Sequence, residues 1–430
     1  GGRLPRVLGL LELTASGVGI IIGAGIYVLL GAATAEAGAA VWASFGLAAV
    51  LCGLTALSYA ELASMFPHSS AEYDYTRRVL PARAAFVVGW SMAAGLMVAA
   101  AAIAIGFAHY LRYFLDIPLA VGAIALLIAE GAIALGGLRH SARLTLLLSA
   151  IQVGGLLVII AIGASHVGSE SLVAGSSPGR VLGGAALVFF AFIGFDEVIT
   201  LAEETHHPTT VVPRALLLAL GISTVLYVAV AVAAVSVVGA DTLAGSSRPL
   251  ADVMAHALGG RAESTTAVIA LISTTNTSLL ALTAGSRILY GMADRGVLPS
   301  ALARISVRSQ VPATAIVVTL IGAIAFASVG DLTLIASVTD FAVYLVFLAV
   351  NATVVLLRLR QPALPRPFRS PWAIGRVPVL PVAGFIAAAA MVPQLDPSAI
   401  WLGLAMAGLG ALAYGPLQRG RRVTSDPVED

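Results

Sequence analysis

Long apolar runs separated by short polar or proline-containing breaks dominate this 430-residue sequence. A helix needs about 20 apolar residues to cross the hydrocarbon core of a bilayer. Twelve runs approach that length, at residues 14–34, 41–64, 84–111, 118–137, 143–164, 181–203, 213–238, 264–286, 312–330, 332–357, 377–394 and 398–416. Helices satisfy their own backbone hydrogen bonds inside a membrane. We therefore predict an all-α polytopic membrane protein with twelve transmembrane helices.

The composition excludes a soluble globular protein. Hydrophobic residues make up 59% of the chain and charged residues only 11%, against roughly 25% charged residues in soluble domains. The 24 basic residues are all arginine and lie in scattered short clusters, so we expect no nucleic-acid partner. The lone cysteine, Cys52, cannot form a disulfide within the chain.

The arginines also predict an orientation, because short cytoplasmic loops carry an excess of positive charge. With the N-terminus inside, 20 of the 24 arginines fall in cytoplasmic segments. We therefore expect a multi-pass protein of the cytoplasmic membrane with both termini in the cytoplasm. Residues 1–13 would form the N-terminal segment and residues 417–430 the C-terminal tail.

Two of the apolar runs are interrupted by glycine. The first contains GVGIIIGAGI at 17–26, and the sixth contains FFAFIGFD at 189–196. They lie five helices apart, and an odd number gives two repeats of opposite topology. We predict an inverted repeat in which residues 14–164 (helices one to five) correspond to residues 181–357 (helices six to ten), with helices one and six discontinuous.

A broken helix exposes backbone N–H groups where one half begins and carbonyls where the other ends, and such groups persist in a membrane only where they line a cavity. In helix one, residues 20–22 would offer carbonyls and residues 25–27 N–H groups, which suit a carboxylate. In helix six, the carbonyls of Phe190, Ala191 and Ile193 suit an ammonium group. The pattern indicates a backbone clamp for a zwitterion. The alternative is that the glycines only permit close helix packing.

Four ordered motifs carry a family resemblance. They are GIIIGAGIYVLLG from residue 19, SYAELASMFPHSSAEYDY from 58, FFAFIGFDEVITLAEETHHPTTVVPRAL from 189 and SRILYGMADRGVLP from 286. The chain resembles the amino acid-polyamine-organocation superfamily, and within it the bacterial cationic amino acid transporter group. The resemblance is specific from about residue 8 to 310 and looser beyond.

The resemblance implies five plus five inverted helices followed by two extra helices, here residues 377–416, and alternating access to a central site. In relatives, the substrate carboxylate lies on the helix-one break and the amino group lies between carbonyls of helices one and six. An aromatic residue at the Phe190 position closes over the substrate as a gate, the alternative role being core packing. The substrate-binding residues carried over in this way are Ile21, Gly23, Ala24, Gly25, Ile26, Phe190, Ala191 and Ile193.

Three departures from the family pattern affect specificity and coupling. Ala24 stands where relatives have Ser or Thr. Gly95 stands where many relatives have an acidic residue, and this second departure puts a preference for cationic substrates in doubt. Gln152 stands at the lysine of proton-coupled relatives, and glutamine cannot carry a proton. This favours exchange, facilitated diffusion, or coupling along a proton path through Glu130. A sodium site among the hydroxyls of residues 273–278 is a further alternative.

We therefore predict a secondary active or exchange transporter of L-amino acids. The alternatives are a polyamine or other organic-amine transporter of the same fold, or a facilitative or sodium-coupled permease. No motif of a membrane-embedded enzyme is present, and we expect no cofactor and no metal site. The expected partners are an amino acid or amine substrate, the lipid bilayer, and a co-transported proton or a counter-substrate.

Two acidic residues, Glu61 and Glu72, lie near the cytoplasmic end of the second run. Ionisable groups within membrane spans cost free energy, so each is a candidate functional residue. Arginines follow closely in sequence, so we expect a structural ion pair with Arg77 or Arg78.

Overall fold

Helices make up nearly all of the regular structure in the computed structural model, which describes residues 8–66, 71–137 and 142–422. The α-helices are α1 Leu10–Ile21, α2 Ala24–Ala37, α3 Val41–Met65, α4 Ala71–Arg77, α5 Ala82–Leu111, α6 Leu119–Leu135, α7 Ala142–Ala164, α8 Pro178–Val188, α9 Pro208–Val238, α10 Ala240–Ala244, α11 Pro249–Leu258, α12 Gly260–Asp294, α13 Ala313–Ala327, α14 Leu332–Arg360, α15 Val379–Met391 and α16 Pro397–Arg422. The 3-10 helices are η1 Gly38–Ala40, η2 Phe189–Phe192, η3 Phe195–Glu204, η4 Ser300–Ala303 and η5 Val392–Gln394. Strands β1 Ala373–Ile374 and β2 Val377–Pro378 pair antiparallel.

Each of the predicted apolar runs overlaps one or more helices of the described chain. By length and composition, 8 helical segments of the described chain can cross a membrane. Four further apolar helical segments, α1, α6, α13 and α15 with η5, are only 10–17 residues long. The all-α, multi-pass class is thus confirmed, whereas the count of twelve spans stays a prediction. Residues 1–7 and 423–430 of the expected termini, and residues 67–70 of the second motif, lie outside the described chain.

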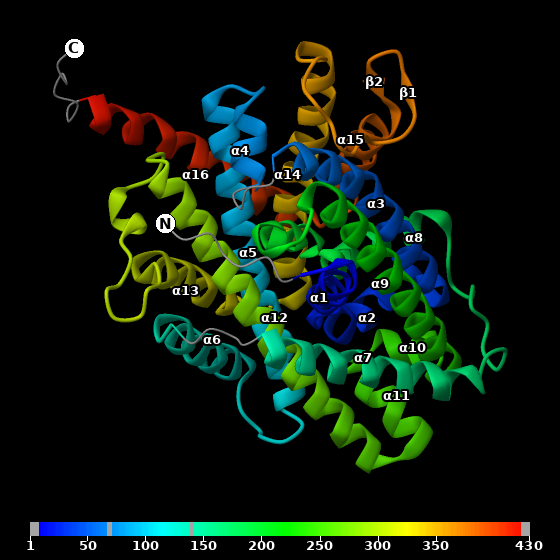
Figure 1. The fold of residues 1–430 in the computed structure, drawn as a ribbon. Coiled ribbons are helices and arrows are strands. Elements are labelled where there is room, and N and C mark those ends of the chain that lie inside the picture. Colours follow the sequence, from blue (N-terminus) through cyan, green and yellow to red (C-terminus); the bar gives the residue numbers. More distant parts are fainter. Residues whose placement is uncertain (1–7, 67–70, 138–141, 423–430) are drawn as a thin grey trace, which may run out of the picture.

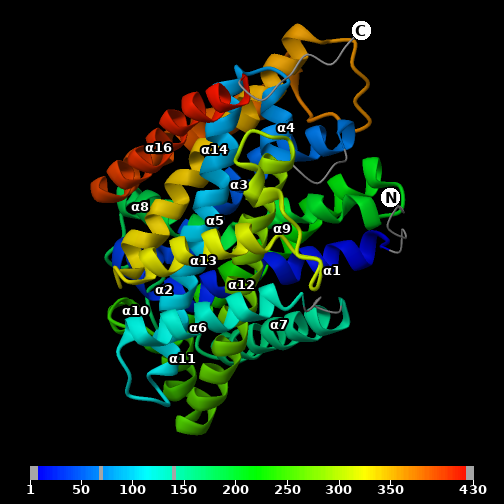
Figure 2. The same cartoon turned by 90° about the vertical axis from the view of Figure 1, so that its left-hand side faces the viewer.

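Helix α5 forms the middle of the bundle. It packs against α6, α12, α13 and α14, while α3 packs against α8, α9 and α15. Residues 98–105 of α5 are small or branched and all buried, and small residues let neighbouring backbones approach closely. The short half α2 lies inside the bundle at mid-height and α1 leads into it from one side, with α4 toward one end of the molecule and α11 toward the other (Figures 1 and 2).

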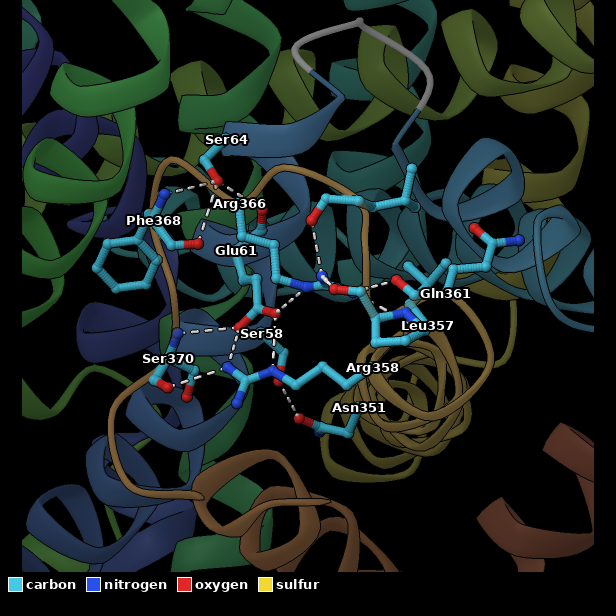
Figure 3. Close-up of polar contacts among 12 residues, drawn as sticks. Ser58, Glu61, Ser64, Asn351, Leu357, Arg358, Gln361, Arg366, Phe368 and Ser370 are labelled. Carbon is cyan, nitrogen blue, oxygen red and sulfur yellow. Dashed lines mark hydrogen bonds and ion pairs between the residues drawn. The ribbon is translucent and has the colours of Figure 1, made fainter. Parts of the chain in front are cut away.

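A buried ion cluster ties together the ends of α3 and α14 (Figure 3). The Glu61 carboxylate pairs with Arg358 and lies 3.4 Å from the Arg366 Nε, and the Ser370 N–H donates to it at 2.9 Å. The expected pairing with Arg77 or Arg78 is therefore wrong for Glu61. Its partners come from about 300 residues further along the chain, because α14 and the loop that follows it lie beside the end of α3.

Glu72 likewise has a different partner from the one expected. Its carboxylate accepts a hydrogen bond from the Tyr59 hydroxyl at 3.2 Å, which ties α4 to α3. Arg78, one of the expected cations, instead stacks over the Phe66 ring, with its guanidinium carbon 3.7 Å from the ring centroid.

Candidate functional site

The first membrane run is broken where the glycine pattern predicts. Helix α1 ends at Ile21 and α2 begins at Ala24. A Cβ on Gly23 would lie 2.6 Å from the Thr277 Oγ1 of α12, so only glycine fits this close approach. The first turn of α2 starts here with N–H groups that have no acceptor within the helix.

The sixth run is broken as well. Helix α8 passes into η2, and the chain then turns at Ile193 and Gly194 before η3 begins. Gly194 has φ +103°, in the left-handed region that favours glycine. The chain from Phe189 to Glu204 is therefore not α-helical.

The two breaks touch each other. A Cβ on Gly25 would lie 2.4 Å from the Cα of Ala191, so the start of α2 is packed directly against η2.

Tyr227 of α9 also bridges the two breaks. Its buried hydroxyl lies 2.6 Å from the Ile21 carbonyl oxygen and 2.9 Å from that of Ala191. The Ile21 carbonyl also accepts from the Gly23 N–H at 2.8 Å, so an ammonium group that bound it would displace the Tyr227 hydroxyl.

Thr277 of α12 sits at the N-terminus of α2. Its hydroxyl accepts a hydrogen bond from the Ala24 N–H at 3.2 Å and donates to the Ser273 carbonyl at 2.9 Å. The first N–H of α2 is thus satisfied by a hydroxyl from another helix. Back-bonding to the preceding turn is the usual state of hydroxyls in membrane helices, and Thr274 and Thr275 show it too.

A small cavity of about 40 Å³ lies between the two breaks. That volume has room for only a few water molecules. Helices α5 and α12 close its remaining walls. The lining residues are Ile20, Ile21, Gly23, Ala24, Gly25, Leu96, Ala99, Ile103, Phe190, Ala191, Ile193, Gly194, Glu197, Thr277, Leu280 and Ala281.

Seven of the eight predicted substrate-binding residues line this cavity, and Phe190 is 6% exposed at its edge. Ile26 is buried behind the lining, although its N–H belongs to the first turn of α2. Gly95 does not line the cavity, since a Cβ there would lie 3.0 Å from the Cβ of Ala342 in α14. The neighbouring Leu96 faces the cavity instead.

The two predicted coupling residues lie outside the lining. Gln152 is fully buried in α7, its backbone carbonyl accepts from the Tyr27 hydroxyl at 3.0 Å, and its side-chain amide has no hydrogen bond among the described residues. The Glu130 carboxylate of α6 accepts from the Ser278 hydroxyl at 2.8 Å. Glu130 therefore reaches the helix that carries Thr277, one residue away from it.

Sequence reasoning missed two buried polar residues, Tyr227 and Asp340, and named Thr277 only as one of the hydroxyls of residues 273–278. Tyr227 lies in a long apolar run with nothing local to single it out. Asp340 did offer a signal, as an acidic residue inside the tenth apolar run. It is fully buried in α14, and neither carboxylate oxygen has a hydrogen-bond partner in the described chain.

Comparison with known proteins identifies the family. The model of the amino acid permease family matches residues 8–412. The chain belongs to this family. Within the amino acid-polyamine-organocation superfamily it is therefore a membrane transporter and not an enzyme.

Three relatives of this permease cover most of its length. The branched-chain amino acid permease BcaP of Bacillus subtilis is 30% identical, over 88% of this chain and 85% of the relative. The methylthioribose transporter of the same organism is 29% identical over 88% and 86%. The vacuolar cationic amino acid transporter 4 of Arabidopsis thaliana is 31% identical over 84% and 64%. All three relatives are named as carriers of small organic molecules, but the molecules in their names differ in chemistry.

Proposed function

We propose that this permease moves L-amino acids across the cytoplasmic membrane by alternating access. The observation that carries the proposal is that residues of both broken helices line the same small cavity. The substrate carboxylate would bind the N–H groups at the start of α2, where the helix dipole favours an anion. The ammonium group would bind carbonyls of Ile21 and η2, and Phe190 would close over the substrate as a gate.

The proposed architecture follows from the same breaks. Twelve helices would span the membrane, as two inverted repeats at 14–164 and 181–357 with an additional pair at 377–416. Both termini would lie in the cytoplasm, which the arginine distribution supports. Two broken helices at corresponding places in the two halves are the usual mark of a site at mid-membrane.

We assign exchange or facilitated transport as the mode of action. The chain contains no lysine, and the buried Gln152 amide does not titrate. A proton path, if the transporter has one, would run through a carboxylate such as Glu130, which is 1% exposed.

Countertransport into proteoliposomes tests the proposal. Vesicles loaded with unlabelled amino acids should take up labelled amino acids with no pH or sodium gradient imposed. Gly25→Leu should abolish that uptake, because the new side chain would collide with Ala191 and fill the start of α2. Gly221→Leu is the matched control, since Gly221 is exposed on α9 with no atom within 4 Å of an added Cβ.

Each outcome has a defined meaning. Uptake that persists in Gly25→Leu would refute the clamp at the breaks. Exchange of polyamines without exchange of any amino acid would establish the organic-amine alternative. Uptake that requires a sodium gradient would instead establish a sodium-coupled permease.

A further inference from the structure

The cavity between the breaks has two chemically different walls. One wall is the backbone of the broken segments, with the Thr277 hydroxyl at its edge. The other wall comes from α5 and α12, which pack closely along their lengths. Its side chains are Leu96, Ala99, Ile103, Leu280 and Ala281. None of these five carries a nitrogen, oxygen or sulfur atom beyond the backbone.

The polar wall determines how a substrate would lie in the cavity. On the proposed function, on which this inference rests, the α-carboxylate and α-ammonium groups occupy the two breaks. The substrate side chain must then point away from the breaks, toward the aliphatic wall of α5 and α12. Binding a hydrocarbon side chain there is favourable in free energy, because its apolar surface leaves water. A guanidinium or ammonium group would lose its hydration with no partner to replace it.

Two polar side chains line the cavity, and both are already engaged. The Thr277 hydroxyl is shared between the Ala24 N–H and the Ser273 carbonyl. Glu197 belongs to η3, directly beyond the helix-six break, and has an interaction of its own within the protein. Neither belongs to the aliphatic wall, so neither offers a free charge to the end of a substrate side chain.

We infer that the transported amino acid carries an uncharged aliphatic side chain, and that Leu96, Ala99 and Leu280 determine this specificity. Ala99 limits the size of the side chain from α5, and Leu280 limits it from α12. The small volume of the cavity favours a compact aliphatic side chain over a long cationic one, which needs a deeper pocket.

A substrate panel tests the inference on the reconstituted full-length chain. Labelled alanine, valine, leucine, arginine, lysine and putrescine are each offered to vesicles loaded with the same unlabelled compound. We expect exchange of valine or leucine to exceed that of arginine and lysine by at least about tenfold, because the cationic groups find no partner at the wall.

Variants of the wall make the test specific. Ala99→Leu should lower the leucine-to-alanine uptake ratio by about tenfold, since the added methylenes occupy the space of the substrate side chain. Leu280→Ala should raise that ratio. Ala132→Leu is the matched control, because Ala132 is exposed on α6, and it should leave the ratio unchanged. Thermal unfolding in detergent confirms that each variant is folded.

The failures of the two proposals are distinguishable. If no amino acid exchanges, the proposed function is wrong. If arginine or lysine exchanges better than valine and leucine, the proposed function stands and the aliphatic assignment is overturned. Loss of that cationic uptake in Glu197→Gln would then show that the carboxylate in the cavity selects the substrate. An unchanged ratio in both Ala99→Leu and Leu280→Ala would also overturn the assignment.

Discussion

A single hydroxyl joins the two broken helices. Tyr227 is buried in α9, and its one proton can be donated to either the Ile21 or the Ala191 carbonyl. Both carbonyls stand where the helical ladder is interrupted, and a buried carbonyl without a partner costs free energy. Tyr227 thus satisfies the breaks when no substrate amine is bound, at the same atoms that the proposed ammonium site uses.

Removal of this hydroxyl is therefore expected to affect both stability and transport. Tyr227→Phe should lower the free energy of unfolding by about 1 to 3 kcal/mol, because the buried Ala191 carbonyl loses its hydroxyl donor, whereas the Ile21 carbonyl keeps the Gly23 N–H. It should also lower exchange, since the geometry of the two breaks loosens. Thermal unfolding in detergent and countertransport measure the two effects.

Tyr344→Phe is the control for this variant. It removes a similar hydrogen bond, from the Tyr344 hydroxyl to the Ala186 carbonyl in the regular part of α8. We expect it to lower stability while exchange continues. Equal exchange in wild type and Tyr227→Phe would contradict the role assigned to the bridge.

At the scale of elements, the Glu61 cluster holds α3, α14 and the loop after α14 together. Arg358 and Glu61 are each 2% exposed, and Arg358 also donates to the Ser370 carbonyl at 3.0 Å. The loop is held a second time by Ser64, whose hydroxyl accepts from the Phe368 N–H at 3.1 Å (Figure 3). One carboxylate thus neutralises an arginine of α14 and an arginine of the loop, and it also accepts a hydrogen bond from the loop backbone.

Loss of that carboxylate should destabilise the whole bundle. Glu61→Gln leaves Arg358 buried without a counter-charge, and breaking one side of a buried pair costs about 3 to 5 kcal/mol. Thermal unfolding in detergent should therefore shift clearly downward. Asp116→Asn is the matched control, since Asp116 faces Arg112 on the exposed surface and such pairs contribute little. A Glu61→Gln protein as stable as the wild type would refute the structural role of the cluster.

The sequence predicted the features that depend on local pattern. Apolar runs located the helices, and glycine spacing located both breaks, because a helix cannot continue through Gly23 or Gly194 as they are packed here. The partners of Glu61 could not be predicted, since they lie about 300 residues away along the chain. Leu96 was missed for a geometric reason: one residue turns a helix by about 100 degrees, so the family position at Gly95 faces α14 while its neighbour faces the cavity.

In the molecule as a whole, the cavity between the breaks has the backbone of the broken segments on one wall and the aliphatic side chains of α5 and α12 on the other. The backbone wall would recognise what all amino acids share, and the aliphatic wall would recognise the side chain. Since the binding groups come from both halves of the chain, rocking one half against the other would open the same cavity to either side of the membrane.

The most direct test of this account compares an amino acid with its two truncated analogues. For the best substrate of the panel, uptake is measured in competition with the amine that lacks its carboxylate and with the acid that lacks its amino group. Because the site would be left with unpaired polar groups, we predict that each analogue competes at least about a hundredfold more weakly than the intact amino acid. An amine that competes as well as the amino acid would contradict the account.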